Sequence, residues 1–304
     1  MRVSLMARQW PARDRVTVYP VLTMSCDDES FLVGSDLARF NIRSTGSGAQ
    51  TVLLGHGMGT DQDVWAAQVP VLAAAGLRVV VFDFAGITPS TAQYFSPGRH
   101  RSMHALADDV LAVVQGLGLR DVIYIGHSMG GTAGLLAAEA EPERFQALVT
   151  IGASACYLDD PATGYTGGFS LGQVNQLLRS ALEDHAQWAN GFASTMVGRP
   201  SRNLVTDAFC KSLLSLRADV IHAVLGAALR ADHRAAVERL HVPFYVLQSR
   251  DDAAVPDAAA RWLAQHGLAR LLIHLRAQGH LPHITAPDEI NGALLECLRD
   301  IRHG

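Results

Sequence analysis

The chain has 304 residues, 49% of them hydrophobic, and its 25 Lys and Arg against 29 Asp and Glu leave a net charge of -4. This charge gives no reason to expect a nucleic-acid partner, and the length and apolar content suffice for one large core with an insertion. The four cysteines lie far apart without a CxxC pair, which is typical of reduced thiols in a cytoplasmic protein. Because no long apolar run is present, we expect neither a secretory signal nor a membrane span.

Short runs rich in branched residues alternate with helical stretches along the chain. This alternation predicts an α/β fold, in which a mostly parallel central sheet has helices on both faces. A leading antiparallel strand is expected at Leu37–Arg43, with Phe31–Val33 as a second candidate, and residues 1–33 are an N-terminal extension without an assigned role. The main strands are expected at Thr51–Leu54, Leu77–Asp83, Val122–Ile125, Ala147–Ile151, Val242–Gln248 and Arg270–Leu275.

About 90 residues separate the strand that ends near Ile151 from the strand that starts at Val242, far more than a usual strand-to-helix connection. The sequence therefore predicts a core domain at residues 34–154 and 242–304, with a helical cap at residues 155–241 inserted after the sixth strand. Apolar residues at three-to-four spacing predict four helices in the cap. Their expected ranges are Gly172–Leu182, His185–Met196, Asp207–Leu216 and Ala218–Leu229.

A GxSxG motif at Gly126-His-Ser128-Met-Gly130 follows one of the predicted strands and precedes the helix-favouring stretch Thr132–Ala140. Strand, tight turn and helix are the context of a nucleophile elbow, in which the serine adopts a strained backbone conformation. The two glycines leave room for neighbouring backbone that side chains would block. The motif predicts Ser128 as a nucleophile.

A serine hydroxyl is a weak nucleophile unless a histidine accepts its proton and a carboxylate orients that histidine. Asp251 and Asp252 follow a later strand, and His280 and His283 lie in the loop after the last one. Ser, Asp, His is the chain order of triads in this type of fold. His280, which directly follows a glycine, is the better base, whereas both aspartates remain candidates.

The loop Leu54-Gly-His56-Gly57-Met58-Gly59 follows an early strand and predicts an oxyanion hole formed by the backbone amides of Met58 and Met129. It lacks the third glycine of a dinucleotide fingerprint, and the chain has neither GxxxxGK[ST] nor HExxH. We expect no nucleotide cofactor and no metal. Asp83 ends a predicted strand away from the elbow, so it is interpreted as a structural turn residue.

These motifs resemble the RsbQ-type α/β-hydrolases, which include bacterial stress-signalling proteins and the plant karrikin and strigolactone receptors. The resemblance spans about residues 34–300. It rests on Gly55-His-Gly-Met-Gly-Thr-Asp-Gln-Asp-Val-Trp65, Cys156-Tyr-Leu-Asp-Asp160, Gly167-Gly-Phe169, Trp188-Ala-Asn-Gly-Phe192 and Gly279-His-Leu-Pro-His283.

The resemblance implies an α/β-hydrolase fold and a triad of Ser128, Asp252 and His280, because Asp252 precedes the Ala-Ala-Val-Pro that trails the family's catalytic aspartate. The chain departs from the receptors at Met58, where they usually have an aromatic residue, and at Met129-Gly-Gly after the nucleophile. Both departures favour an ordinary hydrolase over a specialised receptor.

The resemblance further implies four cap helices in a V shape over a hydrophobic pocket, with Trp188 and Phe192 facing the ligand. Phe169 and Leu214 complete the expected substrate-binding residues. We expect a monomeric serine hydrolase that cleaves an ester or lactone of a small hydrophobic substrate. The alternatives are a ligand sensor with slow hydrolysis and a protein signalling partner, or a hydrolase of carbon–carbon bonds in diketones.

Overall fold

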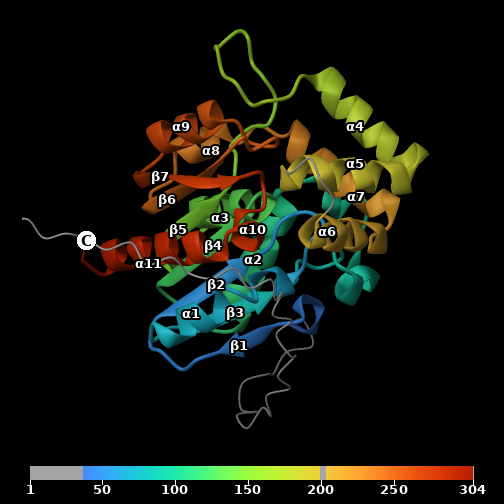
Figure 1. Ribbon diagram of the computed structural model, residues 1–304. Coiled ribbons are helices and arrows are strands. Elements are labelled where there is room, and N and C mark those ends of the chain that lie inside the picture. The colour runs from blue at the N-terminus through green and yellow to red at the C-terminus, as the bar shows by residue number, and fades with distance from the viewer. Residues whose placement is uncertain (1–36, 199–202, 304) are drawn as a thin grey trace, which may run out of the picture. The chain divides into compact units, whose positions relative to one another are not determined.

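The computed structural model describes residues 37–198 and 203–303, and these residues form a seven-stranded sheet with helices on both faces (Figure 1). The strand order is β1-β3-β2-β4-β5-β6-β7, with β1 antiparallel to β3 and the other neighbours parallel. The predicted α/β-hydrolase fold is confirmed. The strands are β1 (Arg43–Thr45), β2 (Thr51–Gly55), β3 (Arg78–Phe82), β4 (Val122–His127), β5 (Phe145–Ile151), β6 (Phe244–Arg250) and β7 (Ala269–Gln278).

Alternating side chains of the buried strands enter two separate cores, because successive residues of a strand point to opposite faces. In β2, Val52 and Leu54 pack with Leu72 of α1 and Leu294 of α11. Leu53 between them joins the other core with α2 and α3. The helices outside the insertion are α1 (Val69–Ala74), α2 (His104–Gly116), α3 (Met129–Ala140), α8 (Arg234–Glu238), α9 (Asp257–His266), α10 (Pro282–Thr285) and α11 (Pro287–His303).

The leading strand differs from the prediction, because Leu37–Phe40 is a short 3-10 helix and only Arg43–Thr45 pairs with the sheet. Asn41 turns the chain between them at φ 45°, and its amide donates to the carboxylate of Asp83 at 2.8 Å. The second candidate, Phe31–Val33, lies outside the described residues. Among the described strands, the insertion follows the fifth, β5.

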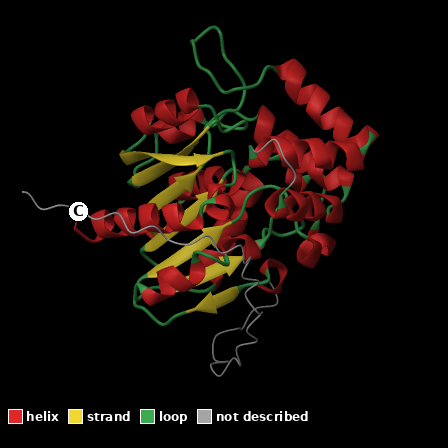
Figure 2. Cartoon of the chain, viewed as in Figure 1, coloured by secondary structure: helices red, strands yellow, loops and turns green. Residues whose placement is uncertain are grey.

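Four of the helices between β5 and β6 lie close to their predicted ranges, and Figure 2 shows them grouped beside the sheet. We call them the insertion: α4 (Leu171–Glu183), α5 (His185–Val197), α6 (Leu204–Ser215) and α7 (Ala218–Arg230). Ser170, Asp184 and Asn203 cap three of these helices by accepting backbone N–H bonds.

No single described helix is long and apolar enough to span a membrane. Helices α6 and α7 reach the length and apolar composition of a membrane span only when they are taken together, and the chain bends by 106° at the break between them.

Candidate active site

Ser128 lies at the tight turn between β4 and α3, where its backbone has φ 52° and ψ -124°. This conformation is rare for a residue with a side chain and is typical of a nucleophile elbow. Its N–H donates to the carbonyl of Ile151 at 2.9 Å. A Cβ at Gly126 would lie 2.6 Å from the Gly130 oxygen, and one at Gly130 would lie 2.3 Å from the His56 oxygen. Gly126 thus leaves room for the start of α3, and Gly130 lets the turn fit beneath the neighbouring loop.

His280 joins Ser128 and Asp252 in one hydrogen-bonded line. The Nε2 atom of His280 lies 2.8 Å from Oγ of Ser128, and its Nδ1 atom lies 2.9 Å from Oδ2 of Asp252. All three groups are shielded, since the side chain of Asp252 is 0% exposed and that of His280 is 7% exposed. The structure therefore brings together the three residues selected from the sequence, in an order that can move a proton from serine to histidine.

The two adjacent aspartates after β6 have different surroundings. Asp252 accepts backbone N–H bonds from Ala254 and Val255 at 2.8 and 3.0 Å, in addition to facing His280. Asp251 is exposed in a left-handed conformation with φ 51°, and it accepts a bond from Gln278 at 3.1 Å. Only Asp252 is positioned to orient the histidine.

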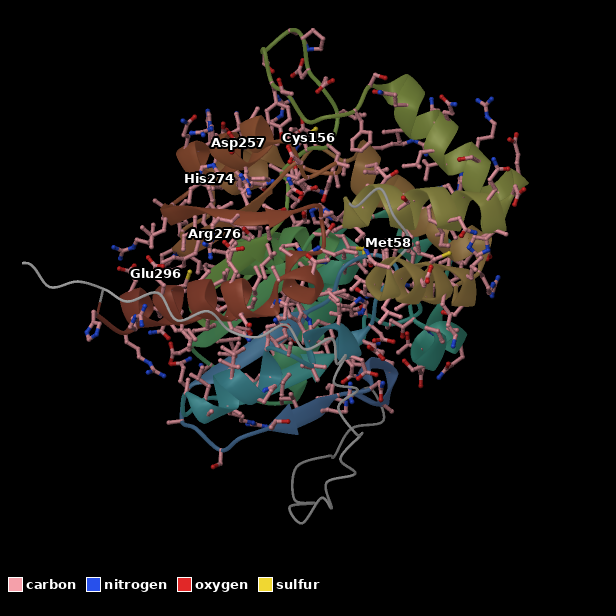
Figure 3. The ribbon with its side chains drawn as sticks, viewed as in Figure 1. Met58, Cys156, Asp257, His274, Arg276 and Glu296 are labelled. Carbon is pink, nitrogen blue, oxygen red and sulfur yellow. The ribbon has the colours of Figure 1, made fainter. Side chains whose placement is uncertain are left out.

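The amides of Met58 and Met129 lie on the two loops that meet at Ser128, and both residues are buried beside it. Within the described residues, neither amide donates to another backbone or side-chain group. Met129 is also the first residue of α3, where the helix dipole favours negative charge. The pair has the features of an oxyanion hole. Figure 3 shows Met58 at the side of the core that faces the insertion, far from His274 and Arg276 on β7.

Two buried histidines, His127 and His283, lie next to the triad. His127 donates from Nε2 to the carbonyl of His280 at 2.7 Å, so it holds the backbone of the base. Its ring lies 4.2 Å from that of His283, whose two nitrogens have no partner in the described part of the chain. Burial, assisted by repulsion from His280, lowers the pKa of His283 to about 3. Burial and then the neighbouring histidines also lower the pKa of His127, so both rings are neutral at ordinary pH.

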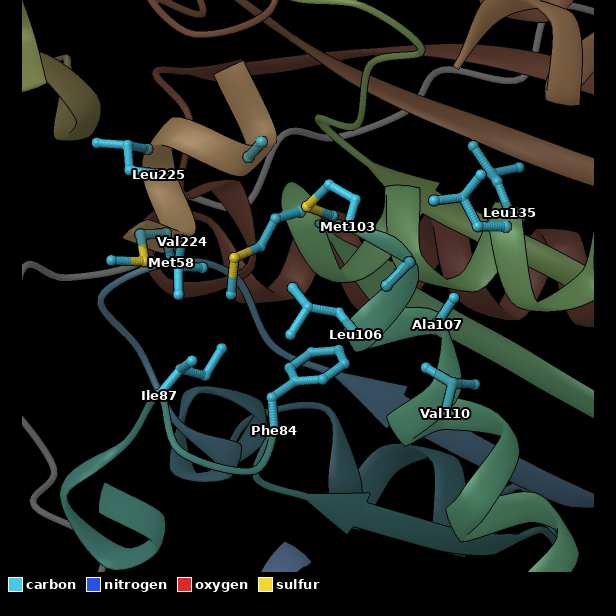
Figure 4. Packing of buried hydrophobic residues seen from close by; sticks show 14 of the residues in the cluster. Met58, Phe84, Ile87, Met103, Leu106, Ala107, Val110, Leu135, Val224 and Leu225 are labelled. Atoms are coloured by element: carbon cyan, nitrogen blue, oxygen red, sulfur yellow. The ribbon is translucent and has the colours of Figure 1, made fainter. Parts of the chain in front are cut away.

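Ser128 opens into a small apolar cavity of about 40 Å³, which we call the chamber. A wider and more open cavity of about 530 Å³ between α4 and α5, the vestibule, adjoins it. Four residues line both cavities and lie between them: Phe169, Leu177, Phe192 and Met196. Figure 4 shows Met58 beside Val224 and Leu225 of α7, where the core meets the insertion. The insertion therefore closes the chamber above the nucleophile.

Comparison with known proteins agrees with this geometry. Residues 50–287 match the family described as alpha/beta hydrolase fold. The karrikin insensitive 2 receptor CA of Petunia hybrida is 34% identical over 264 residues, which cover 86% of this chain and 96% of the relative. The chain belongs to the α/β-hydrolase family. The resemblance found in the sequence motifs is thereby confirmed.

Two further relatives show how broad this α/β-hydrolase group is. The strigolactone esterase D14 of Arabidopsis thaliana is 31% identical over 255 residues, covering 84% of this chain and 94% of the relative. Among solved structures, a hydrolase from Oleispira antarctica superposes with a TM-score of 0.82 at 27% identity, covering 87% of this chain and 96% of that one. Receptors and esterases thus share this fold.

The expected substrate-binding residues of this α/β-hydrolase do not all line the same cavity. Phe169 and Phe192 line the chamber, whereas Trp188 lines only the vestibule and stacks on Phe192 at 4.9 Å. Leu214 was a wrong choice, because it is 44% exposed and lines neither cavity. Its neighbour Leu213 is the residue of that turn that points inward.

Sequence reasoning missed several residues of the chamber. Tyr157 belongs to a recognised motif, yet nothing in the spacing indicated that it would lie beside the nucleophile. The apolar residues at helical spacing in α6 and α7 predicted a buried face but not which side chains reach Ser128. The missed residues include Tyr157, Leu177, Met196, Phe209, Leu225, Ala228, Leu229, Ala254 and Leu281.

Within residues 37–198 and 203–303, no group of three or more His, Cys, Asp or Glu side chains could hold a metal ion.

Proposed function

We propose that this α/β-hydrolase cleaves an ester or lactone of a small hydrophobic substrate through an acyl-enzyme on Ser128. The observation that carries the proposal is the hydrogen-bonded line Ser128, His280, Asp252 at the floor of an apolar chamber. The esterase names of several relatives support the same bond type. The small volume of the chamber limits the acyl group that can lie next to the serine.

In the acylation step, His280 accepts the proton of Ser128 as Oγ attacks the substrate carbonyl. The oxyanion that forms accepts hydrogen bonds from the amides of Met58 and Met129. Asp252 keeps Nδ1–H of His280 pointed toward itself, so that Nε2 is free to act as the base. His280 then gives the proton to the departing alkoxy oxygen, which leaves the acyl group on Ser128.

In the deacylation step, His280 accepts a proton from a water molecule whose oxygen attacks the acyl carbon. The bond between that carbon and Oγ of Ser128 breaks, and Oγ regains a proton from His280. The acid product leaves through the vestibule, which adjoins the chamber.

The test is the variant Ser128→Ala, assayed with p-nitrophenyl acetate and with a butenolide lactone. We expect turnover to fall by a factor on the order of 10⁶ if the triad acts as a unit. Mass spectrometry of wild-type protein quenched during turnover should show an acyl mass on the peptide that contains Ser128. The matched control is Ser215→Ala, which removes an exposed hydroxyl from α6. Retained ester hydrolysis by Ser128→Ala would overturn the proposal.

A second candidate is a ligand sensor in which hydrolysis is slow and the insertion moves when a ligand is bound. The similarity to karrikin receptors favours it, as does a direct contact between the insertion and the triad. The backbone N–H of His280 donates to the carbonyl of Met196, near the end of α5, at 2.7 Å. A sensor would show ligand-dependent protection of α5 from hydrogen exchange together with turnover far below one per second.

A further inference from the structure

The chamber has very few polar side chains. Four of its lining residues carry a nitrogen or oxygen on the side chain: His127, Ser128, Tyr157 and His280. The triad uses two of them, and Nε2 of His127 is taken up by the carbonyl of His280. Tyr157 is therefore the one lining residue with a hydroxyl for which the mechanism above has no use.

Tyr157 is held firmly in place. It lies on the segment that follows β5, where its backbone carbonyl accepts the N–H of Phe169 at 3.1 Å and its side chain is buried in the core. Tyr157 lines the chamber together with Ser128, and its phenol interacts with the side chains of Ser128 and of Thr132, one turn further along α3. Burial raises the pKa of Tyr157, so the phenol is neutral and keeps its proton. A neutral hydroxyl can donate one hydrogen bond and still accept another.

Deacylation places a demand on this chamber that acylation does not. A water molecule must stay next to the acyl carbon in surroundings that are almost entirely apolar, and an ordered water in a protein interior needs two to four polar partners. His280 supplies one partner as the base. Among the lining residues, Tyr157 is the hydroxyl that can supply another beside the acylated serine.

We propose that Tyr157 is a further catalytic residue of this enzyme, one that holds the deacylating water; this inference rests on the proposed acyl-enzyme. The phenol donates its proton toward the hydroxyl of Thr132 and accepts a hydrogen bond from the water. The other hydrogen of the water is then directed at Nε2 of His280. The water oxygen forms the new bond to the acyl carbon, the bond to Oγ of Ser128 breaks, and His280 passes the proton to Oγ.

The experiment is stopped-flow hydrolysis of p-nitrophenyl acetate by Tyr157→Phe, in which the first turnover reports acylation and the steady state reports deacylation. We expect the rate of the first turnover to change less than about threefold. The steady-state rate should fall about 10- to 100-fold, because a misplaced nucleophile reduces attack by up to that amount. A burst near one p-nitrophenolate per enzyme should appear, and the acyl mass on Ser128 should accumulate.

Tyr245→Phe is the matched control, because it removes a tyrosine hydroxyl bonded to Asp300 on the opposite face of the sheet. It should leave both phases unchanged. Added hydroxylamine, a stronger nucleophile than water, should restore turnover of Tyr157→Phe, whereas a disturbed triad would respond to neither nucleophile. Thermal unfolding of both variants reports whether each one is folded.

Equal loss of the first turnover and the steady state in Tyr157→Phe would overturn the inference, and so would an unchanged steady state. Failure of the underlying acyl-enzyme has a different signature. In that case neither wild-type protein nor Tyr157→Phe would show an acyl mass on Ser128.

Discussion

The sheet side and the insertion side of the chamber are built in different ways. On the sheet side, Ser128, Asp252 and His280 each follow the end of a strand, and hydrogen bonds fix each one in place. On the insertion side, helices contribute apolar side chains such as Phe192 and Leu225, which packing alone holds. Directed bonds tolerate very little displacement, whereas packed apolar side chains can adjust by changing rotamer.

This difference assigns separate tasks to the two sides. In the proposed mechanism the sheet side determines the reaction, because it carries the proton path and the amides of the proposed oxyanion hole. In the same proposal the insertion determines which molecules reach the serine, because it lines the vestibule and the roof of the chamber. The two sides meet where the carbonyl of Met196 accepts the N–H of His280 at 2.7 Å. A ligand that shifts α5 would therefore act directly on the backbone of the base.

The most severe test of the sheet side compares the two adjacent aspartates. Asp252→Asn keeps the shape of the side chain but removes the charge that orients His280 and stabilises its protonated form. We expect kcat to fall about 10⁴-fold, as for other triads that lose this carboxylate. Steady-state hydrolysis of p-nitrophenyl acetate measures the change.

Asp251→Asn is the control for that comparison, because it makes the same chemical change one residue earlier. Asparagine tolerates the left-handed backbone at this position, and its amide oxygen can still accept the bond from Gln278. We expect kcat within about twofold of wild type, since the residue does not contact His280. If the two variants were equally impaired, the assignment of the orienting carboxylate would be wrong.

The sheet side could be predicted from sequence because its features are local. Val122–Ile125, the GxSxG turn and the following small residues lie next to one another in the chain, and a parallel sheet brings the ends of its strands to one edge. The choice between Asp251 and Asp252 came from resemblance rather than from this pattern. Its physical basis appears only in the structure, where two backbone amides and His280 surround one of the two carboxylates.

The insertion side could be predicted only as helices. Apolar spacing gave α4 to α7 within a few residues, but a spacing of three to four does not fix how a helix is rotated about its axis. Leu214, expected to bind the substrate, is exposed, whereas its neighbour Leu213 is buried. Tyr157 was missed for a similar reason, since its position depends on how an irregular segment folds back against α3.

A smaller effect is expected from the insertion side. Phe192→Ala removes an aromatic ring that lines both cavities and stacks on Trp188 at 4.9 Å. We expect KM for a hydrophobic ester to rise about tenfold, which corresponds to about 1.4 kcal/mol of lost binding, with kcat changed less than about threefold. Leu214→Ala is the control on a neighbouring helix and should leave both constants unchanged, because its side chain is exposed. A loss confined to kcat would place Phe192 with the reaction machinery instead.

The smallest expected effect concerns stability rather than catalysis, and it tests the buried histidines behind the triad. His283 is 0% exposed and neither ring nitrogen has a partner within the described residues. Burial, and then repulsion from His280, lowers its pKa from 6.5 to about 3. Between these two values the unfolded chain binds a proton that the folded protein does not, so the free energy of unfolding decreases as the pH falls below 6.5.

Replacing His283 by Phe removes this proton uptake while keeping a flat ring against Trp65 and His127. Urea unfolding at pH 7.5 and pH 5 gives the loss of stability on acidification for each protein. We expect that loss to be smaller in His283→Phe than in wild type by about 2 kcal/mol, since each pH unit below 6.5 costs about 1.4 kcal/mol per histidine. Part of the acid sensitivity should persist, because burial lowers the pKa of His127 in the same way. Identical losses in the two proteins would mean that His283 gains a proton in the folded state, which requires a partner for its ring that the packing of α10 does not provide.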